Sequence, residues 1–376
     1  YSPKFKALVP TFRFAAVGMV LITVLGSAQL FEAQLRLDTA LTTSPVVDFD
    51  PNAEPTDPGA EPSDAAGSTA GPAASTAPLP TDAPGPTAGI TSCVGAAAIV
   101  RGFDACPQDP AGKMRPEPVV AKTDIPAAYG DGCWMYAPFG AKRTCKYGSG
   151  EIQVALVGNS HAGQWLPMLQ VLAKKHGWTI TTFLASQCNA TDATLEMFTA
   201  AKNAGCLEYG RWVMEQTRGA RFDLVITSQR QSLRTVGDTW AETGVTAAAG
   251  YTTYLTRWSA AGTNLLVVQD TPFPHKTVPS IPDCLARHRN DQAACAGTPD
   301  DWSRQDPLYD VATSLGLPTV STLEVYRFLC AGNVCPAVIG SVIVYFDGSH
   351  MTTTYARSIA PFVETEILAA LARRAP

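Results

Sequence analysis

The chain has 376 residues, of which 46% are hydrophobic and 16% charged, so a wholly disordered protein is excluded. The net charge of −5 argues against a nucleic-acid-binding protein that relies on attraction to phosphate groups, and we expect no nucleic-acid partner. Proline and glycine are unevenly distributed, and they divide the chain into segments of different character.

The first segment contains an uncharged stretch, Phe14 to Phe31, of about the length that spans the hydrocarbon core of a membrane. Basic residues precede it (Lys4, Lys6 and Arg13) and acidic residues follow, which places the N-terminus in the cytoplasm. We predict a transmembrane helix with its flanks over residues 1–36, and an extracytoplasmic remainder. A cleaved signal peptide is the alternative. Because the chain begins with Tyr1 rather than Met, the helix is also expected to be the last one of a longer membrane domain.

The second segment, residues 37–92, is rich in proline, alanine, threonine and serine. Such a composition buries too little apolar surface to offset the loss of chain entropy on folding. We therefore predict a disordered, semi-extended linker that acts as a spacer. Beyond it we expect a disulfide-containing extension over residues 93–150 and a folded domain over residues 151–376.

All ten cysteines follow the linker. An even number of cysteines beyond a membrane span indicates disulfide bonds in an oxidising compartment. The simplest connectivity, which sequence cannot prove, joins neighbours: Cys93/Cys106, Cys133/Cys145, Cys188/Cys206, Cys284/Cys295 and Cys330/Cys335. Zinc binding is the alternative, but the chain has no C-x-x-C pair and its histidines lack zinc-ligand spacing. We expect no metal ion and no cofactor.

Short apolar runs alternate with helical periodicity in the last segment. The runs predict strands over 152–157, 178–184, 222–227 and 264–269, and the helical spacing predicts helices over 161–176, 243–261 and 354–373. Strands that alternate with helices indicate a parallel sheet covered on both faces. The predicted fold class is α/β, with three layers in the order α/β/α.

The first predicted strand is followed by Gly158-Asn159-Ser160-His161-Ala162. Sites in open parallel sheets form beyond the carboxyl ends of the strands, and Ser160 would stand there at the start of a helix. A serine in this place is exposed to substrate, and backbone amides near it can stabilise an oxyanion. The alternative is that Ser160 only caps the helix.

A second motif, Asp347-Gly348-Ser349-His350, precedes the last predicted helix. With this spacing the Asp347 carboxylate can accept the Nδ1 proton of His350, which leaves Nε2 free to take a proton from a serine hydroxyl. The alternative is a surface aspartate beside a capping histidine. Together, Ser160, His350 and Asp347 form a candidate set of nucleophile, base and orienting residue.

These two motifs resemble those of the SGNH (GDSL-type) hydrolase superfamily, and more closely the SGNH domains fused to membrane acyltransferases of acyltransferase family three. Gly158–Ala162 matches the G-D-S-H-A block of those domains except that Asn159 replaces aspartate, and Asp347–His350 matches the D-x-x-H block. The resemblance covers residues 151–376 and implies a flavodoxin-like sheet. It also implies a membrane acyltransferase module as acyl donor, on the same or a separate chain.

The superfamily takes a glycine and an asparagine as oxyanion donors, but Ser228-Gln229-Arg230 occupies the corresponding place here. We therefore expect the backbone amide of Ser160 to be the main donor, with Gln229 as a second candidate. His161 is expected to pack beside the nucleophile or to contact the acceptor. Trp165, like Trp134 and Tyr136, is a candidate for lining a sugar-binding groove, with burial in the core as the alternative. An α/β-hydrolase is the competing fold, but the closeness of Asp347 and His350 argues against it.

From this pattern we predict an extracytoplasmic O-acyltransferase, with acetyl as the expected group. Ser160 would carry the acyl group to a hydroxyl of a cell-envelope glycan or glycolipid. A carbohydrate esterase with the same triad is one alternative, and a non-catalytic envelope-binding module is another.

Overall fold

The computed structural model describes residues 92–197 and 199–373, together with Met19, Thr23, Gly26, Ser27, Gln29 and Glu32. The remainder of the predicted span and residues 37–91 of the predicted linker lie outside the described residues. Among the residues that are described, no helix combines the length and the apolar character that crossing a membrane requires.

The centre of the fold is a seven-stranded, mostly parallel sheet. Six of its strands follow the order β1-β4-β3-β5-β6-β7, and the seventh, β2, pairs with β4 outside this order. The strands are β1 (Trp134–Met135), β2 (Lys146–Tyr147), β3 (Ile152–Gly158), β4 (Trp178–Ala185), β5 (Leu224–Ser228), β6 (Leu265–Val268) and β7 (Val320–Leu323). Only β2 runs antiparallel, against β4. From β3 onward the order is that of the flavodoxin-like fold, with the second strand of this series beside the first and the others on its far side.

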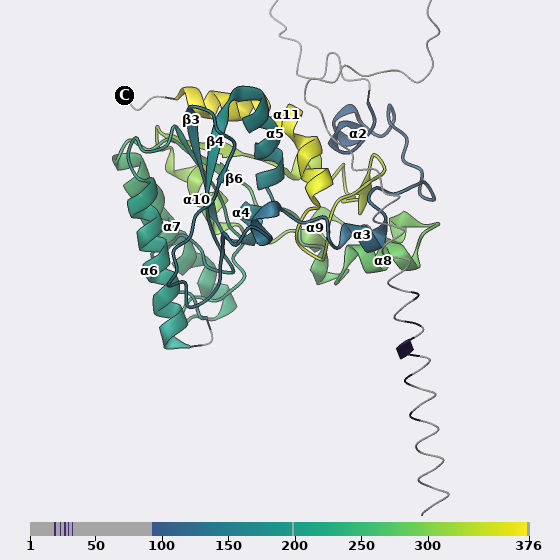
Figure 1. The fold of residues 1–376 in the computed structure, drawn as a ribbon, viewed down its shortest axis with the longest axis horizontal. Coiled ribbons are helices and arrows are strands. Elements are labelled where there is room, and N and C mark those ends of the chain that lie inside the picture. Colours follow the sequence, from purple (N-terminus) through teal and green to yellow (C-terminus); the bar gives the residue numbers. More distant parts are fainter. Residues whose placement is uncertain are drawn as a thin grey trace, which may run out of the picture.

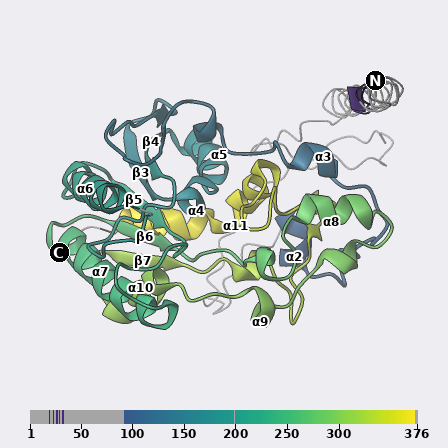
Figure 2. The same cartoon turned by 90° about the horizontal axis from the view of Figure 1, so that it is seen from below.

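Helices cover both faces of the sheet, as Figures 1 and 2 show. Helices α5 and α11 pack together on one face, while α6, α7 and α10 lie on the other. The helices are α2 (Ala96–Arg101), α3 (Pro118–Ala121), α4 (Ser160–Gly163), α5 (Leu166–His176), α6 (Ala200–Thr217), α7 (Trp240–Ala260), α8 (Ile281–Arg287), α9 (Pro299–Trp302), α10 (Pro307–Leu315) and α11 (Thr353–Ala372). The three-layer α/β/α arrangement agrees with the predicted fold class.

The side chains of the central strands pack alternately into two separate hydrophobic cores, one on each face of the sheet. In β3, Val154 and Leu156 join the core under α5 and α11, whereas Ala155 and Val157 join the core under α6 and α7. Successive strand residues point to opposite faces, so a strand buried on both sides must be apolar throughout. This requirement is why the continuous apolar runs of the sequence predict the central strands.

The edge strand β7 was not predicted, and the observed elements differ from the predicted ones at two further places. The helix predicted over 161–176 is broken into α4 and α5 at Gln164 and Trp165, so that Ser160 begins a short helix of its own. The predicted extension, residues 93–150, contributes β1 and β2 to the same sheet as the strands of residues 151–376. Its α2 packs against α11, and α3 packs against α8 in a lobe beside the sheet (Figure 1).

Ten cysteines form five disulfides in the structure. The pairs are those between sequence neighbours: Cys93–Cys106, Cys133–Cys145, Cys188–Cys206, Cys284–Cys295 and Cys330–Cys335. Each disulfide closes a loop outside the central strands. The disulfides therefore restrain connections around the sheet, and the loop closed by Cys133–Cys145 contains Trp134 and Tyr136.

Candidate active site

Ser160 stands at the carboxyl end of β3, at the first position of α4. The turn before it depends on Gly158, which has a φ of +145° and lies so close to β5 that an added Cβ would approach the Ser228 carbonyl oxygen to 2.2 Å. Strands β4 and β5 flank β3, and the chain order of the sheet reverses here. Ligands of such sheets bind where the order reverses, so Ser160 occupies the expected position.

His350 and Asp347 come from the segment between β9 (Val342–Ile343) and α11. The Nδ1 atom of His350 lies 2.8 Å from Oδ2 of Asp347, and the backbone amide of His350 donates to Oδ1 at 2.8 Å. The ring of Phe346 is stacked on the imidazole with a centroid distance of 5.3 Å. The turn therefore fixes both the tautomer of His350, with the proton on Nδ1, and the orientation of its ring.

Two opposing effects act on the Asp347 carboxyl. Burial favours the neutral acid, but hydrogen bonds from His350 and from the Ser349 amide stabilise the carboxylate more, so the pKa of Asp347 lies below its ordinary value. The residue therefore stays ionised at neutral pH. With Nδ1–H donated to this carboxylate, Nε2 of His350 carries a lone pair, and among the described residues it has no hydrogen-bond partner.

A second histidine–aspartate pair lies beside the first one. His161, the residue after Ser160, binds through Nδ1 to Oδ1 of Asp270, which follows β6. The rings of His161 and His350 are 4.7 Å apart between centroids. Burial lowers the pKa of His161 to about 4, even though Asp270 opposes this shift, so its imidazole is neutral at neutral pH.

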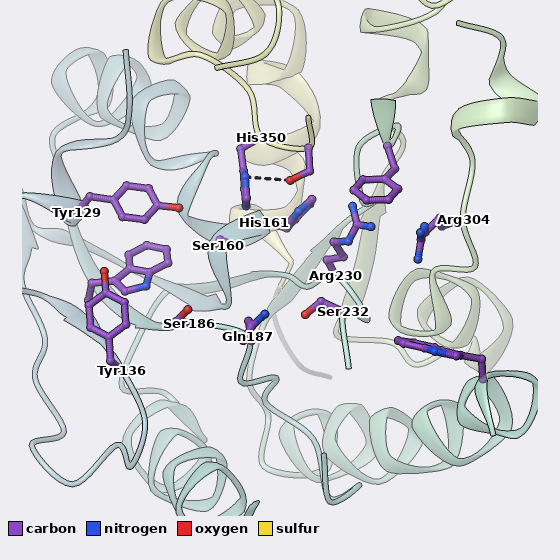
Figure 3. Close-up of a pocket in the computed structure, with 14 residues that line it drawn as sticks. Tyr129, Tyr136, Ser160, His161, Ser186, Gln187, Arg230, Ser232, Arg304 and His350 are labelled. Atoms are coloured by element: carbon purple, nitrogen blue, oxygen red, sulfur yellow. Dashed lines mark hydrogen bonds between the residues drawn. The ribbon is translucent and has the colours of Figure 1, made fainter. Parts of the chain in front are cut away.

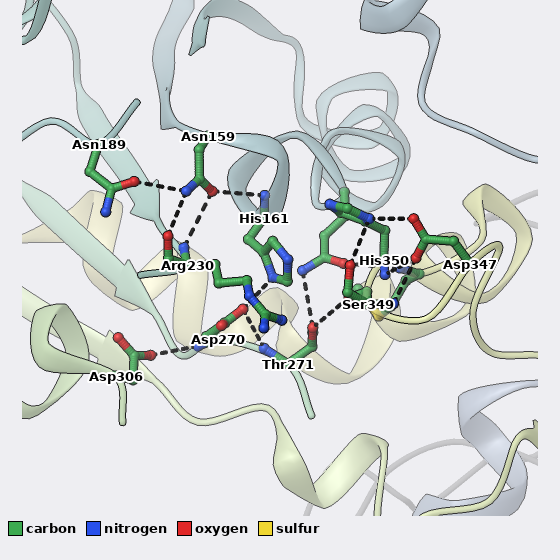
Figure 4. Close-up of polar contacts among 12 residues, drawn as sticks. Asn159, His161, Asn189, Arg230, Asp270, Thr271, Asp306, Asp347, Ser349 and His350 are labelled. Atoms are coloured by element: carbon green, nitrogen blue, oxygen red, sulfur yellow. Dashed lines mark hydrogen bonds and ion pairs between the residues drawn. The ribbon is translucent and has the colours of Figure 1, made fainter. Parts of the chain in front are cut away.

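Asn159 joins the ends of three strands through its side-chain amide (Figure 4). Its Nδ2 donates to Oδ1 of Asn189 and to the carbonyl oxygen of Arg230, both at 2.8 Å. Its Oδ1 accepts from the backbone amides of His161 at 3.0 Å and Arg230 at 3.3 Å. An ionised aspartate cannot donate to the first two oxygens, which explains the asparagine at this position of the block.

Ser160, His161 and His350 line one pocket of about 470 Å³ (Figure 3). At one end of the pocket are aromatic residues of the extension, Tyr129 and Trp134, whose rings stack at 4.2 Å between centroids. The opposite end holds cationic and aromatic side chains, while the nucleophile candidate lies between the two ends. The complete lining consists of Tyr129, Trp134, Tyr136, Ser160, His161, Ser186, Gln187, Arg230, Ser232, Trp240, Phe273, Arg304, Ser349 and His350.

The structure brings the three predicted triad residues together, since Ser160 and His350 share the pocket and Asp347 binds His350. It does not bring Gln229 there: the Gln229 side chain accepts from the Ala190 amide at 2.6 Å and is buried. Trp165 is fully buried in the core beneath α5 and α11 and does not line the pocket. Of the aromatic candidates, Trp134 and Tyr136 do line it.

Several residues of the site were not predicted. Asp270 and Arg230 each lie two residues beyond the carboxyl end of a central strand, β6 and β5, so the rule that selected Ser160 also applies to them. Arg304, by contrast, lies in the connection after α9, and no sequence pattern indicates that it reaches the pocket.

The part of the chain that holds this pocket matches a known protein family. The family model described as "SGNH domain (fused to AT3 domains)" matches residues 129–365, well over half of the chain. Among solved structures, the periplasmic domain of the lipopolysaccharide acetyltransferase of Salmonella ser. Paratyphi A is similar, with 12% identity and a TM-score of 0.44. The alignment covers 64% of this chain and 92% of that one. A search of curated proteins found no match.

The family match extends from the aromatic end of the pocket, beginning at Tyr129, through most of α11. It thus contains β3, the serine that follows it, and the Asp347–His350 turn. The chain belongs to the family of SGNH domains that are fused to AT3 domains.

Proposed function

We propose that this chain is the extracytoplasmic domain of a serine-dependent O-acyltransferase that modifies hydroxyl groups of a cell-envelope glycan or glycolipid. The observation that carries the proposal is that Ser160 lines the same pocket as His350, whose imidazole is already oriented by the Asp347 carboxylate. The family description adds that such domains are fused to AT3 domains, which supports a membrane acyltransferase module as the donor.

The first half-reaction transfers the acyl group to Ser160. Nε2 of His350 takes the hydroxyl proton while Oγ attacks the carbonyl carbon of the donor ester. The backbone amide of Ser160, at the start of α4, is the proposed donor to the oxyanion. Collapse of the tetrahedral intermediate breaks the bond to the donor oxygen, which receives the proton from His350. Asp347 stabilises the imidazolium that forms in between.

The second half-reaction passes the acyl group to the acceptor. A sugar hydroxyl gives its proton to Nε2 of His350 and attacks the acyl-serine, and Ser160 is regenerated with that proton. Water can react through the same steps, so the triad alone does not distinguish transfer from hydrolysis. Acceptor binding must hold a sugar hydroxyl near His350, where proximity outweighs the high concentration of water.

The donor has to come from the membrane. Acetyl-CoA is cytoplasmic and cannot reach an extracytoplasmic site directly, so a membrane module must hand over the acyl group, with acetyl as the proposed group. The predicted transmembrane helix and linker would let one pocket visit that module and an envelope acceptor in turn.

The proposal is tested by mass spectrometry of the full chain mixed with 4-nitrophenyl acetate. We expect a covalent acetyl adduct on Ser160 that is absent from Ser160→Ala, and transfer of the acetyl group when envelope glycans are added. An adduct whose decay no glycan accelerates, together with release of acetate from acetylated glycans, would identify an esterase. No adduct and no reaction with a fluorophosphonate probe would identify a non-catalytic binding module.

A further inference from the structure

The end of the pocket opposite Tyr129 holds two guanidinium groups on one aromatic ring. The Cζ atom of Arg230 lies 3.3 Å and that of Arg304 lies 4.3 Å from the centroid of the Phe273 ring. All three residues line the pocket that contains Ser160. They come from three different connections, after β5, β6 and α9, and Figure 3 shows both arginines on the same side of Ser160.

Arg230 is a buried cation whose donors are not fully used. It is 7% exposed, and its Nη1 has no hydrogen-bond partner among the described residues. A buried charge without a partner is costly, and such groups in native proteins require an explanation. Burial lowers the pKa of Arg230 only to about 10, so the group remains charged at neutral pH.

The carboxylates near Arg230 are engaged by other donors. Oδ1 of Asp270 accepts from His161 and from the Thr271 amide, and both oxygens of Asp347 accept from the Asp347–His350 turn. No ion pair joins either arginine to a carboxylate within the described part of the chain. The guanidinium groups therefore face the pocket with hydrogen-bonding capacity left for a ligand.

The backbone of Arg230 is held in place independently of its side chain. Its amide donates to Asn159 and its carbonyl oxygen accepts from Asn159, the residue directly before Ser160. The backbone from which the Arg230 side chain extends is thus fixed relative to the nucleophile before any ligand arrives. Phe273 covers one face of the guanidinium, so that the N–H groups along its edge remain available. A planar edge of this kind matches the two oxygens of a carboxylate or phosphate.

We propose that Arg230, Arg304 and Phe273 form a subsite for an anionic group, a carboxylate or a phosphate, carried by the acceptor glycan. The inference rests on the proposed function and specifies its acceptor as an acidic carbohydrate. With the anionic group at this end, the sugar that bears it extends toward Ser160, and its neighbour reaches the aromatic end at Trp134 and Tyr136. Arg304, which is exposed, acts at the mouth of the subsite, while Arg230 acts inside it.

The test uses the full chain, 4-nitrophenyl acetate as a neutral donor, and three matched oligosaccharide acceptors: one neutral, one with a uronic acid and one with a sugar phosphate. We expect an acidic acceptor to exceed the neutral one in kcat/KM for transfer by at least about tenfold, since hydrogen bonds to charged groups are strong. Arg304→Gln should remove most of that preference by raising KM for the acidic acceptor only. Comparing kcat/KM for the uronic acid acceptor with kcat/KM for the sugar phosphate acceptor shows whether the subsite prefers a carboxylate or a phosphate. Arg221→Gln, before β5 at the opposite end of that strand, is the matched control.

Direct binding separates this inference from the proposed function. Calorimetric titration of Ser160→Ala with the same oligosaccharides reports on the subsite without any chemistry. Tighter binding of an acidic oligosaccharide, lost in the Ser160→Ala/Arg304→Gln double variant, supports the subsite even if no acyl-enzyme forms. Equal binding and equal transfer of neutral and acidic oligosaccharides would overturn it, and a normal acetyl adduct on Ser160 would then leave the proposed function intact.

Discussion

The two histidine–aspartate pairs beside Ser160 have the same chemical groups but different surroundings. The side chains of His161 and Asp270 are 1% and 12% exposed, whereas those of His350 and Asp347 are 17% and 43% exposed. Each histidine uses Nδ1 for its carboxylate and leaves Nε2 without a partner among the described residues. Hydrogen bonding alone therefore does not identify the general base.

Burial makes the difference between them. Desolvation disfavours the imidazolium of His161, so that residue holds its proton on Nδ1 and resists taking a second one. His350 is more exposed and lines the pocket, where a bound substrate can approach its ring. We infer that His350 exchanges protons during the reaction and that His161 positions the neighbouring groups. The next experiments test this division.

The largest expected effect comes from removing the nucleophile or the base. Ser160→Ala and His350→Ala should each lower kcat on a small acetyl ester by about 10⁴-fold or more, and the double variant should be no worse, because residues that act as one unit are not additive. Steady-state kinetics gives the values, with the exposed Ser314→Ala and His288→Ala as controls. Wild-type activity of Ser160→Ala would refute the assignment.

A smaller effect should distinguish the two aspartates. Asp347→Asn should lower kcat by about 10² to 10⁴-fold, because the amide favours the wrong tautomer of His350. It should leave the melting temperature nearly unchanged, since the side chain is partly exposed. Asp270→Asn replaces a buried carboxylate that accepts hydrogen bonds from His161 and from the Thr271 amide, and should cost about 2 kcal/mol of folding free energy because hydrogen bonds to a charged group are weakened, with a lesser loss of kcat.

Kinetics and circular dichroism on the same two preparations make the comparison of these aspartates direct. If both variants lose kcat to the same extent while remaining equally stable, then both pairs take part in the chemistry and the division by burial is wrong.

The smallest effect concerns the pH dependence of stability. The pKa of His161 is about 4 in the folded protein against an ordinary 6.5, so its contribution is complete above pH 6.5 and is lost as the pH falls toward 4. The loss amounts to about 3 kcal/mol from the pKa difference. His161→Gln should remove this contribution to the dependence of the unfolding free energy on pH, as measured by urea unfolding between pH 4 and 7.

The buried carboxyl of Asp306 changes the stability in the opposite direction over the same range of pH. Burial and the charge of Asp270 raise the pKa of Asp306 to about 7, so its contribution is present at low pH and is lost as the pH rises toward 7. The slope of the unfolding free energy against pH in the wild type is therefore the sum of these two contributions. The informative quantity is the difference in this slope between the wild type and His161→Gln. His288→Gln serves as the control, and an unchanged slope in His161→Gln would contradict the buried, neutral state of that residue.

The parts of the site that the sequence predicts are those carried by short, local patterns. The central strands follow from apolar runs, and Ser160, Asp347 and His350 follow from two motifs at strand and helix ends. The His161–Asp270 pair joins residues far apart in the chain, and β1 and β2 have two residues each, too few for periodicity to be visible. Gln229 and Arg230 are neighbours in sequence, yet only Arg230 lines the pocket. Because side chains alternate along an extended segment, Gln229 points into the core and Arg230 into the pocket.

The aromatic wall of the pocket is built by the chain that precedes β3. Trp134 rests against α4 at Gly163, where an added Cβ would come within 2.7 Å of the indole ring, so this wall and the turn of the nucleophile are fitted to each other. Tyr129 and Tyr136 belong to the same preceding segment, whereas the proposed catalytic residues come from the end of β3 and from the turn before α11. The segment that would contact the proposed acceptor is therefore separate in sequence from the proposed catalytic residues but packed on the helix that begins with Ser160, so an exchange of residues 129–136 has to keep Trp134 against Gly163 if the position of Ser160 is to be preserved.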